Sequence, residues 1–189
     1  MRVDDDADRS EYRSNGGAMP FKATRPPVIP SFGYRYLFFF GDFLNEEELG
    51  DFGILPRPVG VAINPSRRWI TNSEGRATMV GQSGFEVHGM IHAVPEPEVT
   101  ALDLHFGVPR EWERYGGLLR AMDGRLMAAE YYASSCQKPG VADPIYVDRI
   151  ARRGEALGFP NRYVAELRAW TVTPIPHVAL FSDQIHSER

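Results

Sequence analysis

The chain has 189 residues, of which 43% are hydrophobic and 24% charged, and its formal net charge at neutral pH is −4. This length and composition fit one globular domain, and the small negative charge argues against a nucleic-acid-binding surface, which needs many Lys and Arg side chains. The single cysteine, the absence of a signal-peptide pattern and the lack of any apolar run near the ~20 residues of a membrane helix lead us to expect a cytoplasmic protein.

The two ends of the chain differ from its middle. Residues 1–30 are acidic, then polar, then rich in proline, a composition that buries too little apolar surface to order itself. Residues 172–189 carry a short apolar patch that could pack as an extended arm. We therefore expect a disordered tail over 1–30, one domain over 31–171 and an arm over 172–189.

The first predicted strand is the aromatic stretch "YRYLFFFG", which is apolar enough to be buried on both faces. Asn45 followed by Glu48 forms a capping box, so a short helix is predicted to begin at about Glu46. The residues between, 41–44, then form a strand-to-helix loop. Such a loop points backbone N–H groups at whatever lies above the end of the strand.

Four further short strands are predicted, separated by proline and by glycine-containing turns: residues 57–64, 67–71, 76–81 and 84–94. In the last of them Glu86, His88 and His92 lie on one face. His88 and His92 would lie ~13 Å apart along a strand, too far to share a metal ion. We therefore expect a polar or surface role for these histidines and no metal site.

A helix follows at "PEPEVTALDLHFG", because Pro97 suits its first turn and Gly107 the position just past its end. Val99, Leu102 and Phe106 would form its apolar face. After it, Asp123-Gly124 predicts the turn of a β-hairpin.

Two helices are predicted to close the chain. The first is capped by Asp143, has Pro144 in its first turn and ends at Gly158, and Asn161 is expected to cap the second. Their expected apolar stripes are Tyr146, Ile150 and Leu157 in the first, and Tyr163, Val164, Leu167 and Trp170 in the second. The mixture of strands and helices predicts an α+β fold.

Four segments in this order carry a family resemblance: the "GRATMV" strand, the Val-x-Gly strand in "VHGMIHAV", the helix end in "ALDLHFGVP", and the closing "DPIYVDRIARRGEALGFPNRYVAEL". Together they make residues 36–170 resemble the γ-glutamylcyclotransferase and AIG2-like family. The resemblance implies a small closed, mostly antiparallel β-barrel flanked by helices.

The resemblance also implies a reaction and a site. Enzymes of the family release 5-oxoproline from γ-glutamyl compounds, with a glutamate as general acid and base and a Tyr-Gly-Ser-Asn-Leu loop that holds the substrate through its backbone. Aligned with that loop are Phe40, Gly41, Asp42, Phe43 and Leu44, and the resemblance implies substrate-binding positions there. It implies the same for Phe106, which occupies the place of the glutamate, and for Tyr115, which aligns with a substrate-facing tyrosine.

The changed residues predict a changed function. A phenyl ring cannot transfer protons, and general acid–base help is worth about 10²–10⁴-fold, so ordinary cyclotransferase activity should be weak or absent. Asp42 replaces a neutral serine of the loop, so it would repel a carboxylate and attract an amine or guanidine.

Two carboxylates are candidates for the proton transfer that Phe106 cannot provide. Asp42 lies on the loop, and its alternative role is to accept hydrogen bonds from local amides. Glu86 would have a raised pKa inside an apolar barrel, and its alternative role is a barrel-end carboxylate paired with an arginine.

For four other residues a purely structural or surface role competes with a functional one. His105 titrates near neutrality, but a helix turns it ~100° away from its neighbour Phe106, which favours a surface histidine. Cys136 has no histidine nearby in sequence to activate it. Trp112, like Tyr115, is more simply a core residue, and Tyr146 more simply packs a helix on the barrel.

Two hypotheses follow. In the first, the protein is an enzyme whose specificity has changed to a small amino-acid-derived or amide substrate. It would catalyse intramolecular acyl transfer or a lyase-type reaction without a cofactor. In the second, it is a catalytically inactive family member that binds a metabolite or a partner protein. A ligand-sized cavity lined by Asp42, Glu86 and Phe106 would favour the enzyme, whereas a filled barrel would favour the binding protein. The oligomeric state is left open.

Overall fold

The computed structural model describes residues 26–44 and 46–171, and these form a closed five-stranded barrel. The strands are β1 (Tyr34–Phe39), β2 (Arg57–Thr71), β3 (Ala77–Pro95), β4 (Trp112–Ala121) and β5 (Leu126–Ser134). Their order around the barrel is β1-β3-β2-β4-β5. All neighbours are antiparallel except β1 and β5, which close the barrel as a parallel pair at Leu37 and Glu130. The predicted α+β fold with a mostly antiparallel closed barrel is confirmed.

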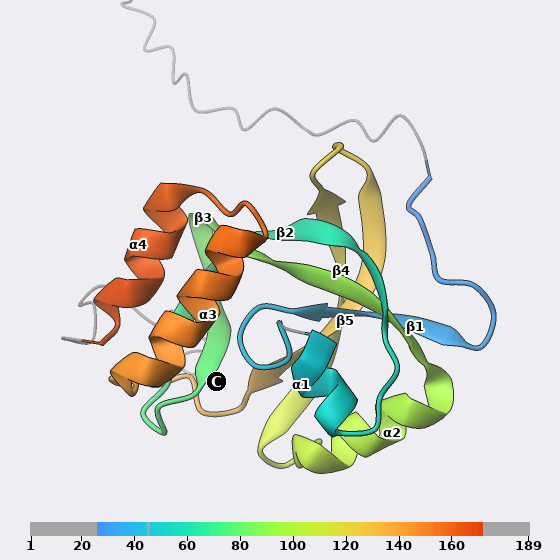
Figure 1. The fold of residues 1–189 in the computed structure, drawn as a ribbon, viewed down its shortest axis with the longest axis horizontal. Helices are drawn as coiled ribbons and strands as arrows, with labels where there is room; N and C mark the ends of the chain where they lie inside the picture. The colour runs from blue at the N-terminus through green and yellow to red at the C-terminus, as the bar shows by residue number, and fades with distance from the viewer. Residues whose placement is uncertain (1–25, 45, 172–189) are drawn as a thin grey trace, which may run out of the picture.

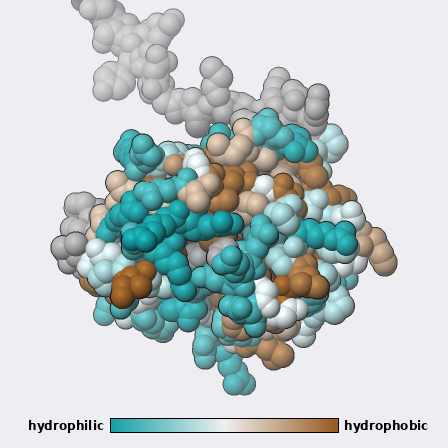
Figure 2. Space-filling model, in the orientation of Figure 1, coloured by the Kyte–Doolittle hydropathy of each residue, from teal (hydrophilic) through white to brown (hydrophobic). Residues whose placement is uncertain are grey.

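Four helices flank the barrel in the described part of the chain: α1 (Glu46–Asp51), α2 (Glu96–His105), α3 (Pro144–Ala156) and α4 (Asn161–Ala169). Figure 1 shows α3 and α4 packed beside each other on one side of the barrel, while α1 and α2 lie on another. Hydrophilic side chains cover most of the face seen in Figure 2, interrupted by separate hydrophobic patches. Within the described residues, no helix is both long enough and apolar enough to cross a membrane.

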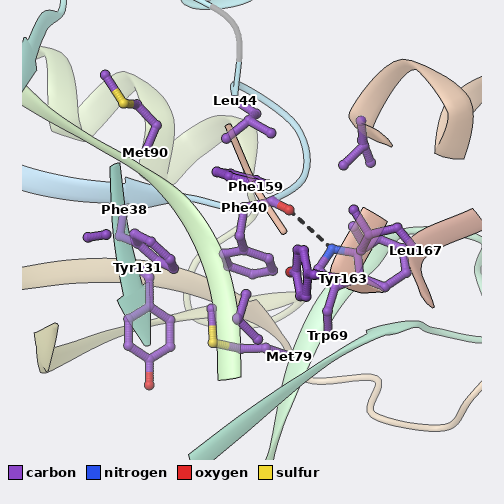
Figure 3. Close-up of a cluster of buried hydrophobic side chains, with 14 of the residues drawn as sticks. Phe38, Phe40, Leu44, Trp69, Met79, Met90, Tyr131, Phe159, Tyr163 and Leu167 are labelled. Carbon is purple, nitrogen blue, oxygen red and sulfur yellow. Dashed lines mark hydrogen bonds between the residues drawn. The ribbon is translucent and has the colours of Figure 1, made fainter. Parts of the chain in front are cut away.

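The second half of β1, from Leu37 to Phe39, is buried on both faces, because its alternating side chains enter two different hydrophobic clusters. The first half differs from the prediction, since Arg35 is exposed and Tyr34 and Tyr36 are only partly buried. Phe38 and Phe40 pack with residues of α3 and α4, and the Trp69 indole donates a hydrogen bond to the Phe40 carbonyl (3.1 Å; Figure 3). Leu37 and Phe39 pack instead with residues of α1 and α2. The first strand therefore joins both helical layers to the barrel.

The prediction of four short strands in the middle of the chain is wrong, because these segments form the two long strands β2 and β3. A register shift at Pro65 and Arg67 lets β2 accommodate a proline without an N–H to donate. Pro65 of β2 pairs with Glu86 of β3, and the next pair is Arg67 with Gly81. Residues 82–85 of β3 therefore have no partner in β2 and form a bulge, not the predicted turn.

Several local predictions are confirmed. The hairpin between β4 and β5 turns at Asp123 and Gly124. The Asp143 side chain accepts hydrogen bonds from the N–H groups of Ile145 and Tyr146, and so caps α3. Gly158 follows α3 at a positive φ of 76°, which glycine adopts without strain.

The apolar faces of α2 and α4 are also as predicted, whereas that of α3 is shifted. In α3 the buried residues are Val147, Ile150, Ala151 and Gly154, and the predicted Tyr146 and Leu157 are only partly buried. The predicted cap of α4 is wrong: Asn161 is its first helical residue and makes no capping hydrogen bond. Pro160 takes the capping position instead, since its restricted φ suits the entry to a helix.

The predicted tail and arm fall mostly outside the described residues, as does Asn45 of the predicted capping box. Within the tail, Val28 is described, and it pairs with Met127 of β5 through backbone hydrogen bonds on both sides. Glu48, the other half of the capping box, accepts a hydrogen bond from the Phe43 N–H (2.9 Å).

Candidate functional site

The loop between β1 and α1 lies directly on the start of β3. A Cβ atom on Gly41 would lie 2.6 Å from the Cβ of Ala77, so only glycine fits there. The Ala77 N–H in turn donates to the Tyr146 hydroxyl of α3 (3.1 Å). The apolar β1 run therefore ends at a glycine because three elements converge on this point.

Phe43, two residues further on, adopts a positive φ of 62°, which is strained for a bulky side chain. The hydrogen bond from its N–H to Glu48 holds this conformation. Its ring is buried against Phe52, His105 and Phe106, with ring centroids 5.1–5.7 Å apart. The loop and the end of α2 are thus joined through aromatic contacts.

Phe106 fills the space beneath the loop. Its ring stacks on Tyr132 with a centroid distance of 4.4 Å and also packs on Trp112. The cavity that remains between the loop and these rings measures only ≈ 20 Å³, about enough for one water molecule. The aromatic side chains therefore leave no room for a substrate at this point.

Two tyrosines border this cavity or the loop, and both stay protonated at neutral pH. Burial raises the pKa of Tyr132, and the hydrogen bond that it donates to Asp103 (2.8 Å) raises the pKa further. Burial and then the charge of Asp42 raise the pKa of Tyr146. Neither phenol can serve as a general base in its ionised form.

A larger cleft of ≈ 260 Å³ opens on the other side of the loop, lined by residues of the loop, α1, α2 and α3. We call it the Asp42 cleft, and its lining residues are Asp42, Phe43, Glu48, Asp51, Phe52, Arg76, His105 and Arg149. Its volume is close to the lower end of the ~300–1,000 Å³ of small-molecule sites.

Ion pairs cross the Asp42 cleft. The Asp42 carboxylate lies 2.7 Å from an Arg76 guanidinium nitrogen and 3.8 Å from one of Arg149. Arg149 also pairs with Glu48 of α1 at 3.2 Å. Asp42 is only 18% exposed, whereas Arg76 and Arg149 are 42% and 57% exposed and can reach a ligand.

His105 provides the cleft with a group that can take up a proton. Burial and then the charge of Arg76 lower its pKa, and Asp42 opposes them in part. The imidazole is therefore neutral at physiological pH and able to accept a proton. His105 is exposed, as expected of a surface histidine, but its ring does not turn away from Phe106: both rings contact Phe43 and each other.

The structure brings most of the predicted site residues together. Phe40, Gly41, Asp42 and Phe106 line the small cavity, and Asp42 and Phe43 line the Asp42 cleft. Leu44 is a buried core residue whose carbonyl faces the Arg153 guanidinium. Tyr115 lies elsewhere, half-exposed on β4 and stacked on Tyr131.

Glu86 does not join the site. Its alternative role, a carboxylate paired with an arginine, is confirmed: the Glu86 side chain is 45% exposed and pairs with Arg120 (3.1 Å), and it also lies 3.2 Å from His88, so it is not a carboxylate inside an apolar barrel. The expected surface role of His88 and His92 is also wrong, since both are buried.

Other groups offer no additional chemistry among the described residues. No three His, Cys, Asp or Glu side chains of 26–44 and 46–171 are grouped as metal ligands would be. The Cys136 thiol contacts the Ser73 hydroxyl (3.2 Å). Trp112 is buried beside Phe106, which agrees with its interpretation as a core residue.

Sequence reasoning missed the two arginines of the site. Arg76 lies in the "GRATMV" segment that marks the resemblance, and its position just before a strand could have suggested it. Arg149 had no such signal, because only the docking of α3 brings it beside α1. Asp51 and Phe52, at the end of α1, were missed for the same reason.

A scan against models of protein families and a search of the curated proteins find no match. Among solved structures, the chain is similar to a γ-glutamyl cyclotransferase, with a TM-score of 0.66 and 19% identity over 79% of this chain and 94% of the other. An uncharacterized protein from Homo sapiens gives a TM-score of 0.66 and 20% identity, with coverage of 72% and 88%. An AIG2-like protein from Mus musculus gives 0.50 and 18%, with coverage of 56% and 80%. The fold is thus that of the γ-glutamyl cyclotransferases and AIG2-like proteins.

Proposed function

We propose that this γ-glutamyl cyclotransferase-like protein binds a small amino-acid-derived molecule in the Asp42 cleft and does not release 5-oxoproline by a glutamate-dependent route. The observation that carries the proposal is the contrast between two spaces on either side of one loop. The space beside Phe106 is ≈ 20 Å³ and aromatic, whereas the Asp42 cleft is ≈ 260 Å³ and ionic.

The side chains of the cleft suit a small polar ligand. Guanidinium groups bind carboxylates and carboxylates bind ammonium groups, so the charged groups on amino-acid derivatives can find partners there. The rings of Phe43 and Phe52, which also line the cleft, can pack against the apolar part of such a molecule. A solved structure with the same fold is a γ-glutamyl cyclotransferase, so amino-acid-derived ligands are the first class to test.

The loss of the family reaction follows from Phe106. Cyclisation needs a group that removes the proton of the attacking amine, and the phenyl ring at that place cannot do so. Tyr132 and Tyr146 keep their protons because burial raises the pKa of both phenols. Repulsion of the substrate by Asp42 matters less than the sequence suggests, since Arg76 neutralises this carboxylate.

The proposal is tested by ligand-detected NMR with amino acids, γ-glutamyl dipeptides and amino-acid-derived amines, followed by calorimetric affinities for the compounds that bind. Asp42→Asn should weaken binding by about tenfold, because the Asp42–Arg76 pair shapes the cleft. Glu86→Gln is the matched control, since it removes a carboxylate outside the cleft. If no compound binds, or if both variants bind as the unmodified protein does, the proposal is wrong.

A second candidate function is catalysis in the same cleft, and the position of His105 favours it. A neutral imidazole beside an ionic cleft can act as a general base towards an amine or water. For any compound that is turned over, His105→Gln should then reduce kcat by about 10²–10⁴-fold while binding persists. The rate should fall as the pH drops through the His105 pKa, which lies below its ordinary value.

A further inference from the structure

We propose that the ligand of the Asp42 cleft is an organic cation: an ammonium or guanidinium group on an apolar body, bound beside Asp51 and Phe52. This inference rests on the proposed function and names the class of molecule. It concerns the charge balance of the cleft and the position of its aromatic rings.

The charges of the cleft do not cancel. Three carboxylates and two guanidiniums line it, and His105 is neutral at physiological pH. Asp42 and Glu48 each already pair with an arginine. Asp51 forms no ion pair within the described residues, so one negative charge remains available to a ligand cation.

The two guanidiniums are partly exposed and can reach a ligand, but each already pairs with a carboxylate of the cleft. Arg76 is held at 2.7 Å by Asp42, and Arg149 bridges Asp42 and Glu48. An anionic ligand would have to displace one of these carboxylates or share its arginine, and it would also face Asp51. A cation meets no such competition at the Asp51 end.

The aromatic side chains next to Asp51 favour a cation as well. Phe52 follows Asp51 in sequence, lines the same cleft and is 49% exposed, so its ring can accept a cation against its face. The ring packs in T-shaped pairs with Phe43 and His105, with centroids 5.1 and 4.4 Å away. Phe52 thus offers a fixed apolar surface beside an unpaired carboxylate.

Three probes that share one apolar body test the inference: phenethylamine carries only the cation, hydrocinnamate only the carboxylate, and free phenylalanine both. Each is titrated into isotope-labelled protein, with affinities and positions taken from the amide resonances. Phenethylamine should bind at least about tenfold more tightly than hydrocinnamate and shift the amides of α1 and of residues 104–106. Free phenylalanine should lie between them.

Asp51→Asn should weaken phenethylamine binding by about five- to tenfold and leave hydrocinnamate unchanged or tighter. Asp123→Asn, which removes an exposed carboxylate on the β4–β5 turn, is the control and should change neither. If hydrocinnamate or free phenylalanine binds best at the cleft, the inference is overturned while the proposed function stands. If no probe binds, the inference fails, and the compound screen above decides the proposed function separately.

Discussion

Single residues on the loop after β1 determine the local shape of the site. Gly41 fits because Ala77 leaves no room for a side chain. Phe43 has a positive φ, a conformation that asparagine would tolerate better than phenylalanine. The ring contacts of Phe43 with Phe52, His105 and Phe106 offset this strain. Aromatic packing thus stabilises a strained residue of the loop.

Gly41→Ala should destabilise the protein by about 1–3 kcal/mol, because its Cβ would overlap that of Ala77. Urea denaturation measures the effect. The double variant with Ala77→Gly should recover most of the loss, since it removes the opposing atom. Gly50→Ala is the control: its Cβ meets nothing in α1, and the change should be neutral or stabilising by up to about 1 kcal/mol. An equal loss at both glycines would contradict the close approach.

His92 should make the protein less stable in acid. Burial lowers its pKa from 6.5 to about 4, with a smaller contribution from Arg153. The unfolded chain therefore takes up this proton near pH 6.5 while the folded protein does not, so the stabilisation present above that pH is lost as the pH falls towards 4.

At about pH 5 this loss should reach roughly 2 kcal/mol relative to about pH 8. His92→Leu should remove that part of the pH dependence, as measured by urea denaturation at both values. His88, whose pKa is also lowered by burial, will preserve some dependence in the variant. An identical pH dependence in the two proteins would rule out the assignment to His92.

At the scale of elements, two helices build the site from opposite sides. Glu48 of α1 and Arg149 of α3 are joined by an ion pair, and the loop with Asp42 lies between them. The rigidity of the cleft therefore depends on where α3 begins and how it sits on the barrel. The Asp143 cap and the contact of Tyr146 with β3 set that position.

Asp143→Ala should cost about 1 kcal/mol of stability, because the N–H of Ile145 loses its acceptor. Thermal unfolding provides the measurement. Asp143→Asn should retain most of the stability, since an asparagine oxygen can accept the same hydrogen bond. If the asparagine variant loses as much as the alanine variant, charge rather than capping is the cause.

The elements could largely be predicted from the sequence, and the site only in part. Strand β1, the Asp123-Gly124 hairpin and the Asp143 cap depend on residues close together in the chain, so local patterns identify them. The sequence left two roles open for Glu86, because the choice between them depends on the register of two long strands and on a partner, Arg120, from a third. Arg149 was missed since a helix pattern does not say which neighbour its side chain reaches.

At the scale of the whole molecule, one barrel carries two spaces of opposite character beside the same loop. Aromatic rings close the space beside Phe106, and ion pairs line the open one. The barrel fold is that of the γ-glutamyl cyclotransferases. We therefore expect this chain to share the fold and to lack the reaction.

The release of 5-oxoproline from γ-glutamylalanine by the purified, unmodified protein tests this expectation most directly. A γ-glutamyl cyclotransferase assayed in parallel shows that the substrate and detection are sound. The account predicts no release above the rate in buffer alone, because Phe106 provides no base and the cavity beside it holds about one water molecule. Turnover comparable to that of the reference enzyme would contradict it and would mean that another group in this chain performs the family reaction.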